Sequence, residues 1–446
     1  MRVAIIGTGP AGLACLKTIM QLNKENSEKI EITWYDIGKT YNEENKSKLE
    51  NSTALKSYFG DAYSYDQNEY TKIAKGPSSP NLWPSAGRGG FSRVWGATLI
   101  GETDADFFDG YVENMGLESK LLTEGGKQIL SRFANLNQRD RKNFQILPLK
   151  MAVKADLCTK CGQCLIGCPQ NAIWCATDGT LESEKIVHRN SEFVKSIEIG
   201  REGLLTLIST NHVDQFNKVF IAAGPISSAA ILFNSGLINE ACYLRDSQTI
   251  FNLFFHKRYT KTTERFALAQ SSFNLRMKNR LVSNIQIYPC GETLIDHLSS
   301  INILKKIPRS LISFLSQYLA AGIAYLPPEN SGKIRLEKNK IGEFSIQVEK
   351  PNGRLRILLE YFKSSFNCLR KIGMWQIPFI KLAGIGEGYH FGNLYSLSDS
   401  NMIKNLASEG IYIVGAAALI ELPTGPITDH LIKDTIKRTR DAFRVY

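Results

Sequence analysis

The sequence predicts an α/β protein with more than one domain. Val3–Ile6 read as a buried strand, Leu13–Leu22 are compatible with a helix, and Ile30–Tyr35 read as a second strand. With 446 residues, the chain is long enough for two large domains and an insert, each with its own core. Its 43% hydrophobic and 22% charged residues are typical of a globular protein and exclude wholesale disorder.

The turn after the first strand carries a dinucleotide-binding fingerprint, Gly7-Thr-Gly9-Pro-Ala-Gly12. In this pattern the first glycine makes the tight turn, the second lets the backbone approach a pyrophosphate, and the third lets helix and strand pack closely. The acidic residue that ends the second strand can accept a hydrogen bond from a ribose hydroxyl. A Rossmann-like domain is therefore predicted, binding FAD or NAD through Gly7, Gly9, Pro10, Ala11, Gly12 and Asp36.

A cysteine run in the second quarter of the chain predicts an iron–sulfur cluster. Cys158, Cys161, Cys164 and Cys168-Pro have the ferredoxin spacing C-x2-C-x2-C-x3-C-P. Structural zinc usually takes two C-x2-C pairs separated by a long loop, and disulfides need an oxidising compartment, so both are disfavoured. The fourth ligand is either Cys168 or Cys175, and the cluster is [4Fe–4S], with [3Fe–4S] as the alternative.

The formal net charge of +11 predicts an acidic partner, such as a phosphorylated or nucleotide-linked substrate, an anionic membrane surface or an acidic electron carrier. We expect no nucleic-acid partner, because no nucleic-acid-binding module is readable. Met1–Gly7 lead directly into the first strand without a secretory signal, so we expect a cytoplasmic location, with association at the inner face of the membrane as an alternative.

A second glycine-rich loop carries a family resemblance. Gly87-Arg-Gly-Gly-Phe-Ser-Arg-Val-Trp-Gly96 resembles the G-G-S-S-x-V-W-G segment of the glucose–methanol–choline (GMC) flavoprotein oxidoreductases, and Val219–Gly236 is similar to their A-A-G-x-x-x-S-P-x-L-L-x-x-S-G signature. Further segments follow in family order: Leu326–Leu336 resemble the start of a substrate-domain strand, Gly388–Gly392 the H-x-x-G element, and Gly410–Ala417 with Pro423–Thr428 the closing segment.

The resemblance implies FAD rather than NAD and a discontinuous architecture. A doubly wound FAD-binding domain would comprise residues 1–150, 181–245 and 384–446. Residues 151–180 would form a small ferredoxin-like iron–sulfur insert, and residues 246–383 a substrate domain built on an antiparallel sheet.

The resemblance also implies roles for individual residues. His390 would be the catalytic histidine, supported by Thr428, whereas Gly425 stands where the family places a second polar residue and Gly415 where it has Asp. We read the remaining histidines His188, His212, His256 and His297 as structural, and keep His430 as a candidate substitute for the missing polar group. The further cofactor contacts implied are Gly89, Gly90, Trp95, Gly96, Ala223, Gly224, Gly415, Ala416, Pro426 and Ile427.

Two apolar stretches are predicted as helices. Ser310–Leu326 follow Lys305, Lys306 and Arg309, and their 17 residues include Ser and Gln, which disfavours a membrane span. We expect a buried helix of the substrate domain there, with a helix lying on the membrane surface as the alternative. Arg354–Lys371 mix apolar and basic residues at helical spacing and predict a surface helix.

The predicted activity is oxidation of a secondary alcohol, with a sugar, nucleotide sugar or polyol as the preferred small-molecule substrate. His390 would take the hydroxyl proton, the hydride would move to flavin N5, and electrons would leave through the cluster to an external acceptor or ferredoxin-like carrier. Two alternatives use the same parts: a ferredoxin-fed reductase of a lipid-linked or polyprenyl substrate, and an electron-transfer protein whose substrate site has decayed.

Overall fold

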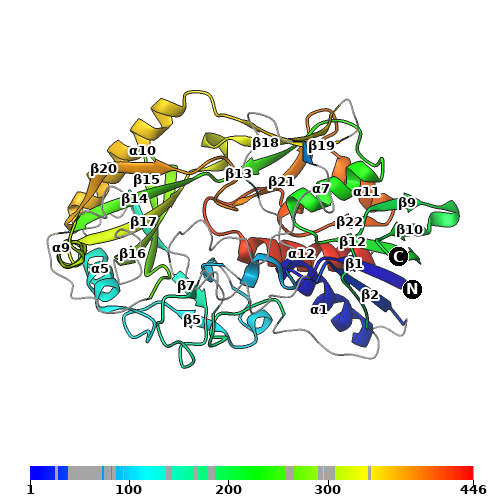
Figure 1. Cartoon of the computed structure of the whole chain (residues 1–446), viewed down its shortest axis with the longest axis horizontal. Helices are drawn as coiled ribbons and strands as arrows, with labels where there is room; N and C mark the ends of the chain where they lie inside the picture. The colour runs from blue at the N-terminus through cyan, green and yellow to red at the C-terminus, as the bar shows by residue number, and fades with distance from the viewer. Residues whose placement is uncertain are drawn as a thin grey trace.

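A parallel sheet and a large antiparallel sheet lie at opposite ends of the molecule (Figure 1). The computed structural model describes residues 1–25, 29–38, 73–74, 82, 87–93, 95–101, 103–136, 143–147, 149–164, 168–177, 186–256, 266–289, 295, 307–339 and 343–444. Val94, His297, Lys305 and Lys306 therefore lie outside the described residues.

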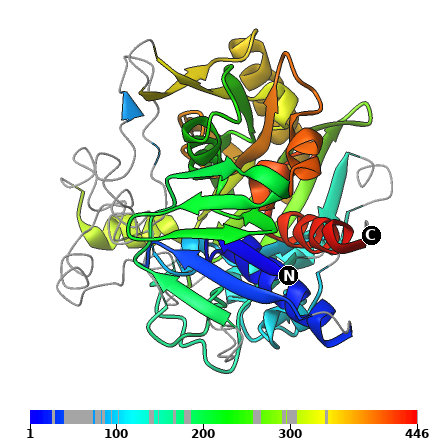
Figure 2. The same cartoon turned by 90° about the vertical axis from the view of Figure 1, so that its right-hand side faces the viewer.

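The parallel sheet is assembled from distant parts of the chain, as predicted. Its order is β22 (Ile411–Ile413), β12 (Lys218–Ile221), β1 (Arg2–Ile6), β2 (Glu31–Asp36) and β8 (Ile186–Asn190), and each neighbouring pair is parallel. Figure 2 shows the blue N-terminal strands beside green strands from the middle of the chain, with the red C-terminal helix next to them. β1 is almost completely buried, which explains its continuous apolar run.

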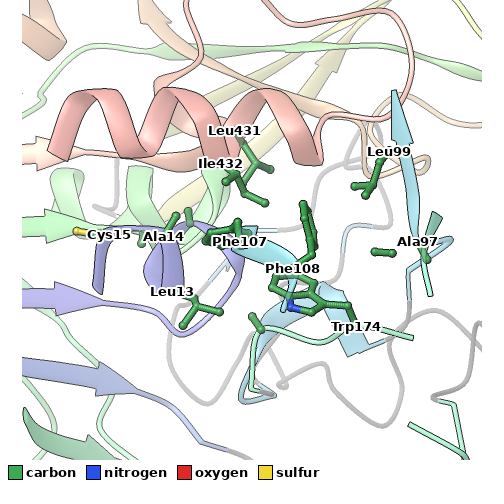
Figure 3. Close-up of a cluster of buried hydrophobic side chains, with 14 of the residues drawn as sticks. Leu13, Ala14, Cys15, Ala97, Leu99, Phe107, Phe108, Trp174, Leu431 and Ile432 are labelled. Carbon is green, nitrogen blue, oxygen red and sulfur yellow. The ribbon is translucent and has the colours of Figure 1, made fainter. Parts of the chain in front are cut away.

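Helices α1 (Pro10–Glu25) and α12 (Thr428–Arg444) pack against each other beside this sheet. The predicted helix Leu13–Leu22 falls within α1 and is confirmed. Leu13 of α1, Leu431 of α12 and Phe108 belong to one apolar core, which Figure 3 shows reaching Trp174 from the cysteine-rich part of the chain. The cysteine-rich segment therefore shares an apolar core with helix α1, which begins in the N-terminal fingerprint. Helix α7 (Pro225–Asn234) lies in a second core, with β12 and β22.

A six-stranded antiparallel sheet confirms the antiparallel architecture predicted for the middle of the chain. One face packs on helix α10 (Arg354–Leu369), where Ile250, Phe254 and Tyr361 are buried together. The strands, in sheet order, are β20 (Met374–Leu382), β14 (Thr249–His256), β17 (Leu319–Tyr325), β16 (Arg280–Pro289), β15 (Ser271–Met277) and β6 (Phe144–Leu147).

A five-stranded sheet combines strands from different parts of the chain. Some of its strands lie within the predicted substrate segment 246–383, and others precede or follow it. Its order is β21 (Phe391–Ser396), β13 (Cys242–Asp246), β18 (Lys333–Lys338), β19 (Phe344–Glu349) and β3 (Ile73–Ala74). Two three-stranded sheets and three shorter α-helices account for the other strands and α-helices of the described residues: β9 (Ser196–Ile199), β10 (Leu205–Ile208), β11 (Val213–Phe216), β4 (Thr98–Ile100), β5 (Val112–Asn114), β7 (Leu149–Ala152), α5 (Glu124–Ala134), α9 (Arg309–Ser316) and α11 (Met402–Ser408).

The helix predicted over Ser310–Leu326 is wrong in its second half. Helix α9 ends at Ser316, and Leu319–Tyr325 form a central strand in which burial alternates along much of its length. An apolar run of this length is ambiguous by periodicity alone, and pairing with β14 and β16 decides it. Arg354–Lys371 are helical as predicted. Within the described residues, no helix has the length and apolar character needed to cross a membrane.

The packing of this sheet can be tested by a substitution at Gly322 in β17. A methyl group there would lie 2.2 Å from the ring of Phe254. We therefore expect Gly322→Ala to lower the free energy of unfolding by about 1–3 kcal/mol, the usual effect of overpacking a core. Gly116→Ala is the matched control, since a methyl group there meets nothing within 4 Å. Chemical denaturation measures both; equal stability of the two variants would contradict this packing.

Candidate functional site

The fingerprint turn leaves no room for side chains at two of its glycines. A methyl group on Gly12 would lie 1.9 Å from the carbonyl oxygen of Gly7, and one on Gly7 would lie 2.5 Å from that of Ala222. Gly7 also has a φ of +104°, a conformation that disfavours other residues. Helix α1, strand β1 and the end of β12 therefore meet backbone to backbone, as the fingerprint predicts for Gly7 and Gly12.

The second glycine-rich loop and the closing segment both reach this turn. The Gly89 backbone N–H donates to Oγ1 of Thr8 at 3.1 Å, and a methyl group on Gly90 would lie 3.3 Å from Cα of Gly9. A methyl group on Gly415 would lie 2.7 Å from Cβ of Ala11. The structure thus brings together three segments that were singled out separately in the sequence.

The other predicted cofactor residues lie next to the ends of strands and helices. Ala223 and Gly224 follow β12, and Gly224 has a φ of +78° immediately before α7. Trp95 donates its indole N–H to the Trp174 carbonyl at 3.0 Å, and Gly96 follows it. Ala416 lies in the short helical turn after β22, where its carbonyl oxygen packs on Gly392. Pro426 and Ile427 precede α12, which begins at Thr428.

Asp36 carries a buried polar atom that the protein leaves without a partner. Its Oδ2 has no hydrogen bond, while Thr8 donates to the carboxyl group. Burial raises the pKa of Asp36, and Thr8, the Gly38 backbone, Arg88 and Arg93 oppose that shift. A buried acceptor without a donor is costly. A ribose hydroxyl would supply that donor, so the site fits the adenosine half of a dinucleotide.

His390 is held in one tautomer. Its Nδ1 lies 2.5 Å from the Gly388 carbonyl oxygen, which can only accept, so Nδ1 carries the proton and Nε2 keeps its lone pair. Burial lowers the pKa of His390 to about 4, so the ring is neutral near pH 7. The ring packs on Tyr325 of β17, with centroids 4.6 Å apart. The side chain is therefore suited to accept a proton at Nε2.

The junction between β13 and β14 fixes the loop that carries this histidine. The Ser247 backbone N–H donates to the His390 carbonyl at 2.9 Å, and the Gln248 amide donates to the Ala383 carbonyl at 2.7 Å. Asp246 accepts from the Gly386 N–H at 2.9 Å, and burial raises the pKa of Asp246 to about 7. Three consecutive residues thus bind both ends of the loop.

Polar residues of the antiparallel sheet, which the sequence analysis did not select, complete the site. A methyl group on Gly425 would lie 3.1 Å from Oδ1 of Asn284, so an asparagine from β16 fills the space beside the glycine. Asn284, Gln286 and Tyr288 alternate along β16 on one face, and the Gln286 amide nitrogen is buried without a partner. The sequence signal that could have identified these residues is a polar side chain at every second position of an otherwise apolar strand.

The four cysteines of the run lie within electrostatic reach of one another. Cys158, Cys161 and Cys168 each act on the thiol of Cys164, and burial raises the pKa of Cys164 to about 12. Among the described residues, no three His, Cys, Asp or Glu side chains approach closely enough to hold a single metal ion.

Backbone N–H groups point at three of these sulfur atoms. Lys160 donates to Cys158, Ala267 to Cys164, and Ala172 to Cys168 at 3.3 Å. Such bonds stabilise negative sulfur and tune the potential of a bound cluster. The donor set fits an iron–sulfur cluster.

Cys175 lies at the second glycine-rich loop. Its Sγ is 3.5 Å from Oγ of Ser92, and a methyl group on Gly89 would approach it to 2.9 Å. This position favours Cys168 over Cys175 as the fourth ligand. His430 is exposed in the first turn of α12, and its role as a substitute for the missing polar group stays a prediction. His212 contacts Glu192 at 2.9 Å, and His256, the last residue of β14, is buried.

Comparison with solved structures identifies the architecture. Pyridoxine 4-oxidase from Mesorbium loti aligns with a TM-score of 0.64 at 11% identity, covering 100% of this chain and 99% of its own. Aspergillus oryzae formate oxidase aligns with a TM-score of 0.58 at 9% identity, covering 99% and 97%. The chain has the fold of the GMC flavoprotein oxidoreductases.

Sequence comparison adds one result to this GMC-type fold. Residues 151–174 match the family model described as a 4Fe-4S binding domain, which contains all four cysteines of the run and ends before Cys175. No curated protein sequence matches the chain. The predicted combination of a flavoprotein fold and a 4Fe–4S motif in one chain is therefore supported.

Single cysteine substitutions will test the cluster ligands. We expect Cys168→Ser to lower the iron content of anaerobically purified protein, because it removes a thiolate ligand. Cys175→Ser is the control and is expected to keep full iron content. Iron and sulfide analysis measures both, and loss of iron only in Cys175→Ser would reverse the assignment.

Asp36→Ala will test the dinucleotide site. We expect FAD affinity to fall roughly ten- to a hundredfold, since a hydrogen bond to a charged group contributes about 1.5–3 kcal/mol. Titration of apoprotein with FAD, followed by quenching of flavin fluorescence, measures this change. Asp109→Ala, which alters an exposed carboxylate paired with Lys17, is the control. Unchanged FAD affinity in Asp36→Ala would remove this residue from the site.

Proposed function

We propose that this protein is an FAD- and iron–sulfur-dependent oxidoreductase that oxidises a secondary alcohol and passes electrons on through the cluster. One observation carries the proposal: residues 168–177 join the cysteine run to the second glycine-rich loop. The Ala172 N–H donates to Cys168 Sγ at 3.3 Å, and the Ala176 N–H donates to Ser92 Oγ at 2.9 Å. Only a few residues of continuous backbone separate these two contacts.

The segment is held firmly along its length. Ile173 forms a β-bridge with Val153, and the Trp174 N–H donates to the Ala152 carbonyl at 2.9 Å. The Trp174 side chain is completely buried against Phe107 and Phe108. Ser92 in turn donates to the Gly89 carbonyl at 2.6 Å. A rigid connection of this kind supports electron transfer between a one-electron and a two-electron centre.

The chain's own residues would orient the alcohol and take its proton. His390 Nε2 would accept the hydroxyl proton, while Tyr288, Gln286 and Asn284 offer polar atoms on the adjoining sheet face. FAD, held by the fingerprint turn and the loops around it, would supply hydride acceptance at N5. Thr428 begins α12 directly after the closing segment, and its hydroxyl would support His390 in place of the missing polar residue.

The cluster favours a dehydrogenase with an external electron acceptor, such as a ferredoxin-like carrier. The net charge of +11 supports an acidic carrier. Pyridoxine 4-oxidase and formate oxidase are named for small organic substrates, which supports a small molecule here. A sugar or polyol is the substrate class implied by the family resemblance. The reversed reaction, from ferredoxin to a lipid-linked substrate, is the second candidate, favoured by the exposed apolar residues near β17.

Anaerobic spectroscopy will test the proposed function. A substrate alcohol is expected to bleach the flavin absorbance and then to produce the paramagnetic signal of a reduced cluster in the same sample. The measurement is optical titration combined with electron paramagnetic resonance. Reduction of the flavin by a low-potential donor but by no alcohol would overturn the dehydrogenase direction and favour the ferredoxin-fed reductase.

His390→Gln will test the proton acceptor. Loss of a general base lowers a rate by about 10²–10⁴-fold, and we expect that loss in flavin reduction without loss of bound FAD. His212→Gln is the control. In the unsubstituted protein the neutral imidazole is the active form, so its contribution is present above the pKa of about 4 and is lost as pH falls through it. A rate that titrates near pH 6.5 would assign the proton to another group.

A further inference from the structure

One face of the antiparallel sheet carries an apolar strip that begins at His390. In the register of β14 and β17, Thr249 pairs with Tyr325, Phe251 with Ile323, Leu253 with Ala321, and Phe255 with Leu319. Directly paired antiparallel residues point to the same face, and alternate residues of a strand share that face. Eight side chains thus line one continuous strip: Thr249, Phe251, Leu253, Phe255, Leu319, Ala321, Ile323 and Tyr325.

This strip is not part of the core that α10 covers. The core takes the alternate residues of the same strands, such as Ile250, Phe254 and Ala324. On the strip, by contrast, Phe251 is 44% exposed and Phe255 is 43% exposed. Large apolar side chains are therefore left at the surface on the face of the sheet that contacts His390 through Tyr325.

The near end of the strip is polar and touches the site. Tyr325 packs on the His390 ring at 4.6 Å, and a methyl group on Gly388 would lie 2.7 Å from Cγ2 of Thr249. The Thr249 hydroxyl is buried without a partner. Asn284 of β16 pairs with Tyr325 at this end, and Gln286 and Tyr288 pair with Ile323 and Ala321 farther along the strip.

The far end of the strip is aromatic. Phe255 stacks on Tyr318 and packs on Trp375, with centroids 6.1 Å apart in each pair, and Phe314 of α9 packs edge-on to Tyr318 at 5.8 Å. From Tyr325 to Leu319 the strand advances six residues, or roughly 20 Å. The strip is thus polar beside the proton acceptor and along its edge with β16, and apolar along β14 from Phe251 to Phe255, with Lys381 of β20 beside Phe251.

We propose that this strip binds the apolar tail of the substrate, so that the substrate is a long-chain secondary alcohol of lipid or isoprenoid type rather than a free sugar. The inference rests on the proposed function, because it places the hydroxyl at His390. A sugar would set hydroxyl groups against Phe251, Leu253 and Phe255 of β14, whose side chains offer no hydrogen bonds. A hydrocarbon tail would bury the same side chains, and the hydrophobic effect would favour binding.

A homologous series of 2-alkanols, from 2-butanol to 2-dodecanol, is the probe. Each added CH2 that becomes buried is expected to tighten binding about fourfold until the strip is filled. Two readouts follow the series: the rate of anaerobic flavin reduction, and the fluorescence of Trp375, identified by its loss in Trp375→Phe. The second readout reports binding without turnover. Sorbitol and glucose serve as polar comparators.

Two variants locate the tail. Phe251→Ser and Ile323→Ser are expected to weaken binding of 2-dodecanol by about tenfold or more and to leave 2-butanol unchanged, since only the longer chain reaches these side chains. Leu359→Ser is the matched control, because Leu359 is 61% exposed on α10, the helix that covers the opposite face. The two variants at separate strands guard against a local folding defect.

The outcomes separate this inference from the proposed function. Flavin reduction by glucose or sorbitol, or by alkanols with no dependence on chain length, overturns the apolar tail site and leaves the alcohol dehydrogenase intact. Chain-length-dependent quenching of Trp375 without flavin reduction supports the tail site and removes the proposed direction of reaction. Chain-length dependence in both readouts supports both.

Discussion

The close approach of backbone to backbone at the end of β1 is the constraint on which the rest of the structure depends. Gly7, Gly12 and Ala222 meet at distances that admit no added methyl group. The loop at Gly89 and Gly90 and the turn at Gly415 then reach the same point. Segments from the beginning, middle and end of the chain share one small volume, so a dinucleotide bound there would contact all of them.

The cysteine run is integrated into this arrangement rather than appended to it. Trp174 belongs to the same apolar core as Leu13 of α1 and Leu431 of α12. Packing of this kind would fix the distance between a cluster and a flavin bound to these segments, because neither segment can move without disrupting a shared core. A flexible tether would leave that distance variable.

Sequence reasoning predicted the features that depend on local spacing. The fingerprint glycines, the cysteine run and the order of the motifs can be read directly because each requires particular residues at fixed intervals. The strand Leu319–Tyr325 was missed because its apolar run fits a helix equally well, and only pairing with β14 and β16 decides. Asn284 and Asp246 were missed because their positions beside Gly425 and Gly386 arise from contacts between distant strands.

The locked imidazole has a stereochemical consequence. Nδ1 is committed to the Gly388 carbonyl, so the free lone pair of His390 has one fixed direction, and the strip along β14 and β17 extends from the Tyr325 ring that packs on it. A secondary carbon held by its oxygen and by one substituent can present its hydrogen to the flavin from one side only. Its mirror image would exchange hydrogen and methyl at that position. The arrangement therefore implies enantiomer discrimination that originates in the chirality of the fold itself.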